Sequence, residues 1–362
     1  MMNLIEKLEN NQRLEFEDAT KLYDLDLFTL GKYANKIREV KNGKKIYFNI
    51  NRHINPTNLC SDVCKFCAFS SHRQNSLKTY TMSHEEIMEI VDKSVLNGVK
   101  EIHIVSAHNP NVSWQWYLEI FKMIKDKYPN LHIKALTAAE VDYLHRKHNL
   151  SYEEVIEKMI EYGVDSMPGG GAEIFDEGVR NEICKGKVSS DNWLKIHSLW
   201  HQKGRQSNAT MLFGHIESKE HRIDHILRIR SLQDHSLALN NGGGFNAFIP
   251  LVYQRDNNYL KNIPFLGSIE ILKTMAISRI LLDNINHIKA YWATSTLNLA
   301  LIAQEFGADD LDGTIEKESI QSSAGAKSQN GKSQKEFIEL IQTSGFVPVE
   351  RDSLYNEIKI YN

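Results

Sequence analysis

A regular alternation of strand-like and helix-like segments is the feature that most restricts the fold of this 362-residue chain. Short runs of alternating or β-branched apolar residues are separated by longer segments whose apolar residues recur at helical spacing. The predicted strands are 45–52, 101–105, 131–136, 165–169, 206–213, 245–252, 286–292 and 308–313. The predicted helices include 114–126, 190–203, 219–232, 268–284 and 295–306, and capping boxes mark two more helix starts at Ser83 and Ser151. Eight such strands predict an α/β protein with a parallel sheet closed into a (β/α)8 TIM-type barrel.

The barrel is expected to occupy residues 45–326, after a helical N-terminal extension at 1–44. The remaining residues, 327–362, are predicted to form a loop and a helix that pack on the barrel. The loop is expected because Ser322–Lys335 is rich in Ser, Gln, Gly and Lys. An open, doubly wound parallel sheet is the alternative arrangement of the same strands and helices.

Composition and charge exclude several classes of protein. The 43 Lys and Arg residues nearly balance the 46 Asp and Glu residues, so no broad basic face is available for nucleic acid. No apolar run approaches the roughly 18 residues of a membrane span. The first residues include Glu6 and Glu9 and lack an apolar core, which argues against a signal peptide. We therefore expect a cytoplasmic protein that does not insert into membranes.

Three of the four cysteines, Cys60, Cys64 and Cys67, fall within eight positions, directly after the first predicted strand. Loops that follow barrel strands lie at the C-terminal face, where barrel enzymes have their active sites. Thiolates suit iron–sulfur clusters, copper(I) or zinc, and structural zinc needs four ligands, usually from paired cysteine motifs. The sequence has no second pair, which favours a [4Fe–4S] cluster with one open iron over a zinc loop or chance clustering. Cys184 is isolated and is expected to be a small buried residue without a role in iron binding.

The Cys-x3-Cys-x2-Cys spacing, with Phe66 before the last cysteine, is the signature of the radical S-adenosylmethionine (SAM) superfamily. Further stretches resemble one branch of it, which contains the two radical enzymes of the futalosine route to menaquinone and the deazaflavin-cofactor synthase subunits. These stretches are Cys64–Ser70, Pro168–Phe175, Ser207–Glu217, Phe245–Pro250, His287–Trp292 and Asp309–Thr314. The resemblance runs from about residue 45 to 326, and the forms Gly-Gly-Gly-Ala-Glu-Ile-Phe and Ser-Asn-Ala-Thr-Met are most similar to the aminofutalosine synthase family.

The resemblance implies that SAM binds the open iron through its amino and carboxylate groups and is cleaved to a 5′-deoxyadenosyl radical. In the aminofutalosine synthase family this radical adds to the enol-ether double bond of 3-[(1-carboxyvinyl)oxy]benzoate. The products are 6-amino-6-deoxyfutalosine, methionine and CO2 or bicarbonate. Such an enzyme is a transferase of menaquinone biosynthesis that consumes SAM as a co-substrate. An electron donor such as flavodoxin or ferredoxin is the implied partner, and the resemblance names no catalytic side chain.

By resemblance, Phe66 and the segment after the second predicted strand help to bind SAM. Family members usually have a Gly-Gly pair in that segment, which approaches the SAM amino group. This chain has Ser106 and Ala107 there instead. Their backbone carbonyls are expected to do the same work, because every residue has one.

A second group of candidate residues follows the fourth predicted strand. Gly169, Gly170 and Gly171 are expected to let a ligand approach the backbone closely, with a plain tight turn as the alternative. Glu173 is expected to bind ribose hydroxyls, or else to serve as a negative charge at a helix N-terminus.

The last predicted strand supplies the candidate substrate-binding residues. Asp309 and Asp310 are expected at its end, on the active face, with capping of the next segment as the alternative. Arg279 and Lys289 are cations that suit the substrate carboxylates, although a surface ion pair is the favoured role for Arg279.

Two other interpretations remain open. One is the cyclic dehypoxanthine futalosine synthase of the same pathway, which abstracts hydrogen, or, further away, a deazaflavin-cofactor synthase subunit. The stretch Ser207–Met211 favours aminofutalosine synthase over both. The other interpretation is a non-catalytic iron–sulfur electron carrier or scaffold, which rarely needs a barrel of this size or an open three-cysteine site.

Overall fold

The computed structural model describes residues 3–71, 78–260, 262–315, 319–325 and 331–362. Its strands are β1 (Lys45–Asn49), β2 (Asn51–Ile54), β3 (Glu101–Ile104), β4 (His132–Ala135), β5 (Gln206–Phe213), β6 (Gly244–Val252), β7 (His287–Ile288), β8 (Asp310–Gly313), β9 (Val347–Arg351) and β10 (Glu357–Ile360). Its α-helices are α1 (Leu4–Glu9), α2 (Phe16–Thr20), α3 (Leu27–Asn42), α4 (His84–Leu96), α5 (Trp114–Lys127), α6 (Ala138–His148), α7 (Tyr152–Glu161), α8 (Glu177–Cys184), α9 (Ser190–Gln202), α10 (Lys219–Ala238), α11 (Ser268–Leu281), α12 (Trp292–Ser295), α13 (Leu297–Ile302), α14 (Ile320–Ser323) and α15 (Gln334–Thr343). Two short 3-10 helices are η1 (Lys21–Asp24) and η2 (Ala303–Phe306).

The parallel strands form a closed ring. β2 pairs with β3 and β3 with β4, and isolated parallel bridges through Ser166 and Met167 continue the ring to β5. β5 pairs with β6 and β6 with β7, and a bridge between Lys289 and Asp310 leads to β8, which pairs with β1. Ser166 and Met167 thus take the place of the fourth strand. The predicted (β/α)8 barrel is confirmed, and the open doubly wound sheet is wrong.

The first barrel strand is interrupted at Ile50, so the strand predicted at 45–52 appears as β1 and β2. β1 lies between β8 and β9, whereas β2 pairs with β3. On one side, β1 is therefore hydrogen-bonded to β9, whereas β2, its continuation, is hydrogen-bonded to β3. As a result, the last part of the chain is built into the start of the barrel.

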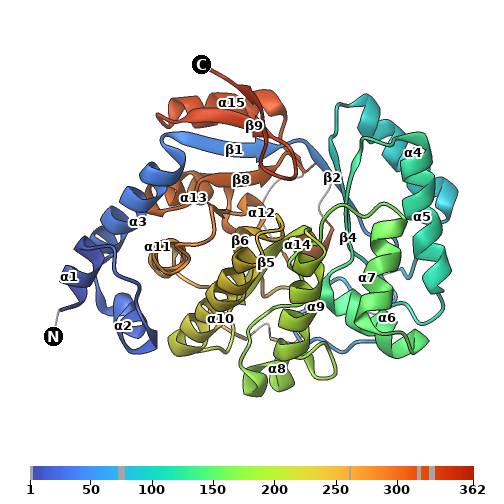
Figure 1. The fold of residues 1–362 in the computed structure, drawn as a ribbon, viewed down its shortest axis with the longest axis horizontal. Coiled ribbons are helices and arrows are strands. Elements are labelled where there is room, and N and C mark those ends of the chain that lie inside the picture. Colours follow the sequence, from blue (N-terminus) through green and yellow to red (C-terminus); the bar gives the residue numbers. More distant parts are fainter. Residues whose placement is uncertain (1–2, 72–77, 261, 316–318, 326–330) are drawn as a thin grey trace.

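The C-terminal part contains two strands that the sequence pattern does not reveal. After α15, β9 runs beside β1 in parallel, and β10 returns antiparallel to β9 (Figure 1). Pro348 lies inside β9, and a proline within a short run argues against a strand. The expected loop and helix are therefore an incomplete description of this part. Residues 326–330 of the predicted loop lie outside the described residues.

Helices precede the barrel, as the sequence predicts, and α3 packs against α11. The Asp26 side chain caps α3 by accepting a hydrogen bond from the Thr29 N–H at 2.9 Å. Inside the barrel region, the structure adds α6 and α8 to the predicted helices. α6 begins with a capping box formed by Thr137 and Glu140, a signal that is present in the sequence.

The inside of the barrel is polar. On β3, Ile102 and Ile104 belong to the apolar core, while Glu101 and His103 lie on the opposite face of the strand. Lys134 Nζ donates a hydrogen bond to Glu101 Oε2 at 2.7 Å, and both side chains are almost fully buried. Many (β/α)8 barrels are filled with branched aliphatic layers instead. Buried ion pairs therefore take part in packing this barrel from within.

Candidate active site

A cavity of about 300 Å³ lies at the C-terminal ends of the barrel strands. Strand residues such as His53, His103 and Asn208 form its wall, together with the loops that follow the strands. Most of the candidate residues from the sequence meet on this wall: Cys60, Cys64, Phe66, Cys67, Ser106, Ala107, Gly169, Gly170, Gly171 and Glu173. The barrel therefore brings three separate loops together at one place, which is where barrel enzymes hold their substrates.

The three clustered cysteines lie between β2 and α4. Cys64 is buried, while Cys60 and Cys67 are partly exposed to the cavity. Burial raises the pKa of the Cys60 and Cys64 thiols, so both favour the protonated form until a metal binds. Three soft sulfur donors on one cavity wall fit a [4Fe–4S] cluster that keeps one iron open.

His108 ties the cysteine loop to the loop after β3. Its backbone N–H donates to Cys60 Sγ at 3.4 Å, and its carbonyl accepts from the Ser61 N–H at 2.9 Å. The His108 Nδ1 atom lies 2.9 Å from Asp62 Oδ2, and its ring stacks on Tyr143 with centroids 4.7 Å apart. His108 thus contacts three consecutive residues that begin with a candidate ligand. The sequence analysis misses this role, because contacts across loops leave no local pattern.

Ser106 and Ala107 line the cavity, and their backbone is already partly engaged. The Ser106 N–H donates to Glu140 Oε1 at 2.8 Å, and the Ala107 carbonyl accepts from the Asn109 N–H at 2.9 Å. Burial raises the pKa of Glu140, a residue that the sequence analysis does not single out. Glu140 therefore fixes the segment in which the family resemblance leads one to expect a glycine pair.

The glycine loop packs tightly against its neighbours. A Cβ atom added to Gly169 would lie 2.8 Å from the Asn208 carbonyl oxygen, and Gly171 has a φ of +90°. Both positions exclude larger residues, the first through contact and the second through backbone conformation. The Gly169 carbonyl accepts a hydrogen bond from Thr210 Oγ1 at 2.6 Å. The loop therefore both lines the cavity and packs closely against β5.

Glu173 lies on the cavity wall but already has a partner. Lys187 Nζ donates to Glu173 Oε1 at 2.6 Å, and the same ammonium group lies 5.5 Å from the centre of the Phe66 ring. Despite its burial, the pKa of Lys187 is raised well above its usual value by Glu173 and Cys64. Lys187 is therefore a cation next to the cysteine loop, and no motif in the sequence identifies it.

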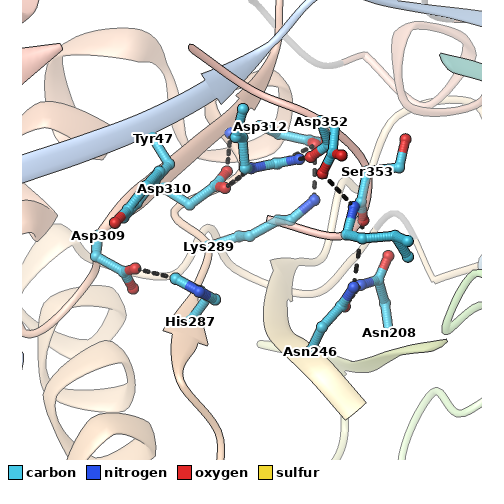
Figure 2. Close-up of polar contacts among 12 residues, drawn as sticks. Tyr47, Asn208, Asn246, His287, Lys289, Asp309, Asp310, Asp312, Asp352 and Ser353 are labelled. Carbon is cyan, nitrogen blue, oxygen red and sulfur yellow. Dashed lines mark hydrogen bonds and ion pairs between the residues drawn. The ribbon is translucent and has the colours of Figure 1, made fainter. Parts of the chain in front are cut away.

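The prediction that Asp309 and Asp310 lie at the active end of the last strand is wrong. Both are fully buried where β8 begins, and neither is among the described residues of the cavity wall. Arg279 donates to Asp309 Oδ1 at 2.6 Å. His287 Nδ1 lies 2.6 Å from Asp309 Oδ2 (Figure 2). Arg279 is itself fully buried, so the surface ion pair expected for it is also wrong. β8 spans Asp310–Gly313, so Asp309 and Asp310 lie at its start, and Asp312, near its end, is on the cavity wall instead.

Cys184 ends α8 and is 2% exposed, as expected for a small buried residue. It is not among the described residues of the cavity wall, in contrast to the three clustered cysteines. Burial raises the pKa of its thiol to about 11. A buried thiol of this kind is unreactive.

Comparisons with known proteins agree with this geometry. The radical SAM superfamily matches residues 54–229, and the CofH/MqnC C-terminal region matches residues 242–362. The solved structure of methylornithine synthase (PylB) superposes with a TM-score of 0.74 at 16% identity, over 96% of this chain and 97% of that one. At this identity the likeness shows the fold alone.

Curated relatives match over nearly the whole length. Aminodeoxyfutalosine synthase of Thermus thermophilus is 40% identical over 100% of this chain and 97% of its own length. A 5-amino-6-(D-ribitylamino)uracil–L-tyrosine 4-hydroxyphenyl transferase of Methanococcoides burtonii is 36% identical over 95% of each chain. Cyclic dehypoxanthine futalosine synthase of Streptomyces coelicolor is 34% identical over 99% of this chain and 89% of its own length. The chain therefore belongs to the radical SAM superfamily, in the group that carries the CofH/MqnC C-terminal region.

Proposed function

We propose that this chain catalyses the aminodeoxyfutalosine synthase reaction. It transfers the 5′-deoxyadenosyl group of SAM to 3-[(1-carboxyvinyl)oxy]benzoate, with loss of one carboxylate as CO2 or bicarbonate. The products are 6-amino-6-deoxyfutalosine and methionine, and the reaction belongs to menaquinone biosynthesis. The observation that carries the proposal is the three-cysteine loop on a cavity wall at the mouth of a closed barrel, in a chain 40% identical to such a synthase.

Cys60, Cys64 and Cys67 would hold the [4Fe–4S] cluster, which supplies the electron that cleaves SAM. The cavity wall then has to bind SAM and the benzoate together and keep water out. Gly169 and Gly170 bring the backbone close to the bound molecules, and Ser106 and Ala107 lie beside the cysteine loop. Holding the enol ether against the adenosyl carbon favours addition over quenching, because oriented reactants gain up to about 7–11 kcal/mol over free ones.

Glu173 and Lys187 have a combined role in this proposal. As an ion pair on the cavity wall, they present a carboxylate and an ammonium group at hydrogen-bonding distance from each other. The free lone pairs of Glu173 suit SAM hydroxyls, while Lys187 places a positive charge near the cysteine loop. In contrast, Asp309 and Asp310 no longer serve as candidates for substrate binding, because they pair with cations at the opposite end of β8.

The cavity and the sequence identities together favour this function over the alternatives. An electron carrier or scaffold has no need of a 300 Å³ cavity beside its cluster. The cyclase and hydroxyphenyl transferase relatives share the fold, but their identities of 34% and 36% are below the 40% of the synthase. The proposal therefore favours adenosyl transfer over hydrogen abstraction.

The proposal also covers the cellular location of the enzyme, its electron donor and its division into parts. Among the described residues, no helix combines the length and the apolar composition of a membrane span. A cytoplasmic enzyme that receives electrons from a flavodoxin or ferredoxin fits the expected chemistry. The division into an N-terminal extension, a barrel at 45–326 and a C-terminal part remains part of the proposal, with β9 and β10 added to the last part.

The experiment that tests the function offers competing substrates to the reconstituted enzyme under strong reductant and without oxygen. The carboxyvinyloxy benzoate, dehypoxanthine futalosine, and 5-amino-6-(D-ribitylamino)uracil with tyrosine are supplied separately with SAM. Mass analysis should show consumption of the benzoate alone. Turnover of dehypoxanthine futalosine instead would establish the cyclase, and SAM cleavage with none of the three would remove all of these assignments.

A further inference from the structure

Asp312 is a buried carboxylate on the cavity wall that the sequence analysis does not single out. It is 7% exposed, and its φ of +70° lies in the left-handed region that non-glycine residues rarely adopt. Such strain persists where the surroundings hold it in place. Here the Asp312 N–H donates to Asp310 Oδ1 at 2.5 Å, and Gly313 packs so closely that an added Cβ would lie 1.9 Å from Asn51 Oδ1. The strand end is therefore built to hold this side chain at one place.

Two cations hold one oxygen of the carboxylate. Lys289 Nζ donates to Asp312 Oδ1 at 2.8 Å (Figure 2). Arg351 lies 3.8 Å from the same oxygen. Both cations are almost fully buried. Burial alone would raise the pKa of Asp312, but Lys289 and Arg351 lower it to about 2. The carboxylate is therefore ionised at neutral pH.

The second oxygen of Asp312 is available to a ligand. In the part of the chain that the structure describes, no group donates a hydrogen bond to Oδ2, and the side chain keeps 10% exposure on the cavity wall. An ionised oxygen that faces a cavity and has no protein donor is a strong hydrogen-bond acceptor for a molecule bound there. A bound molecule with an O–H or N–H group supplies the donor.

The donor follows from the proposed function, on which this step rests. The ionised carboxyvinyloxy benzoate has no O–H or N–H group, so it cannot donate to Asp312 and its charge is repelled. SAM carries such donors on its adenosyl group, namely two ribose hydroxyls and the adenine amino group. We infer that Asp312 accepts a hydrogen bond from the adenosyl group of SAM, and that Lys289 and Arg351 are positioning residues that orient it.

The first test measures SAM binding without turnover. Reconstituted enzyme is titrated with SAM by calorimetry in the absence of reductant. Asp312→Asn should weaken SAM binding about 10- to 100-fold, the effect of losing a hydrogen bond to a charged group, with iron content unchanged. Asp312→Glu keeps the negative charge but moves it, and it replaces Asp312→Asn in the titration if that variant does not fold. Asp142→Asn is the matched control, since Asp142 is 3% exposed and is not among the described residues of the cavity wall.

The second test identifies the donor with three SAM analogues: 2′-deoxy, 3′-deoxy, and a form in which hypoxanthine replaces adenine. On the native enzyme, the analogue that lacks the contacted group should bind about 10- to 100-fold more weakly than SAM. On Asp312→Asn, the same analogue and SAM should bind with equal affinity. Equal losses in both proteins for all three analogues would overturn the inference. So would an Asp312→Asn variant with normal SAM affinity and an altered KM for the benzoate. Failure of the proposed function is a separate result, because SAM would still bind while no adenosyl product forms.

Discussion

Arg351 Nε lies 2.5 Å from Asp310 Oδ2, with both side chains fully buried, and this ion pair joins the end of the chain to the last barrel strand. Close by, the Tyr355 ring stacks on His287 with centroids 3.7 Å apart. Arg351 and Tyr355 therefore close the barrel at the start of β7 and β8. The Arg351 guanidinium also lies 3.8 Å from Asp312 Oδ1, so the C-terminal segment contributes to the shape of the cavity.

Removing this cation should destabilise the fold. Arg351→Ala leaves Asp310 buried without its partner, so we expect the free energy of unfolding to fall by about 3–5 kcal/mol. Urea unfolding measures the change. Arg13→Ala is the control, because Arg13 pairs with Asp234 and Asp283 at an exposed position and should cost about 0–1 kcal/mol. Equal costs for the two variants would contradict the structural role of Arg351.

The second prediction concerns the effect of the cysteines on SAM cleavage and iron content. Replacing Cys60, Cys64 or Cys67 by Ala should abolish SAM cleavage and reduce bound iron, because three thiolates are the fewest that hold the cluster. Cys184→Ala should keep both, since this buried thiol is not among the described residues of the cavity wall. Iron and sulfide analysis after anaerobic reconstitution measures the difference. Loss of iron in Cys184→Ala would mean that the cluster has a fourth protein ligand and no open iron.

This part of the site can be predicted from sequence because its information is local. Three cysteines within eight positions, placed after a strand, define both the ligands and the end of the barrel on which they lie. The roles of His108 and Lys187 cannot be read in this way. Each depends on contacts between loops that follow different strands, which only the closed barrel brings together.

The contacts of His108 predict an effect on the cluster. In His108→Ala the Asp62 contact and the Tyr143 stack are lost, so the loop that carries Cys60 is held less firmly. We expect faster loss of iron to a chelator and a shifted reduction potential, because hydrogen bonds to cluster sulfurs and their surroundings set that potential. Electron paramagnetic resonance during a redox titration measures the potential. His235→Ala, at an exposed position of α10, should match the native enzyme in both measurements. The same behaviour in His108→Ala would contradict the positioning role.

Asp309 predicts how stability depends on pH. Burial alone would raise its pKa, but His287 and Arg279 hold it below its usual value. The folded state therefore gains stability from ionised Asp309 above the unfolded pKa of about 3.9, and loses it as pH falls through the lower folded pKa. In Asp309→Asn this contribution is absent, so its stability deficit relative to the native protein should be largest near neutral pH and should shrink below about pH 4. Urea unfolding between pH 3 and 7 measures the deficit, and a constant deficit across that range would contradict the assignment.

The aspartates of the last strand show where sequence patterns stop being informative. Leu311 separates Asp310 from Asp312, so strand alternation alone does not distinguish these two aspartates, and the sequence analysis selects Asp310 but not Asp312. Arg351 lies near both, but only Asp312, further along the strand, reaches the cavity wall. The positions of the two aspartates depend on the pairing of β8 with β1 and on β9, whose partners are far away in the sequence.

The fate of the adenosyl carbon tests the central claim most directly. The reconstituted enzyme is supplied with SAM that carries carbon-13 at the 5′ position, the carboxyvinyloxy benzoate and a strong reductant, without oxygen. Adenosyl transfer predicts one labelled carbon in each molecule of a product that contains both adenine and the benzoate ring, with one carboxylate lost. Free 5′-deoxyadenosine should be a minor species. Label found only in 5′-deoxyadenosine, in proportion to turnover, would contradict the claim and show that the enzyme abstracts hydrogen.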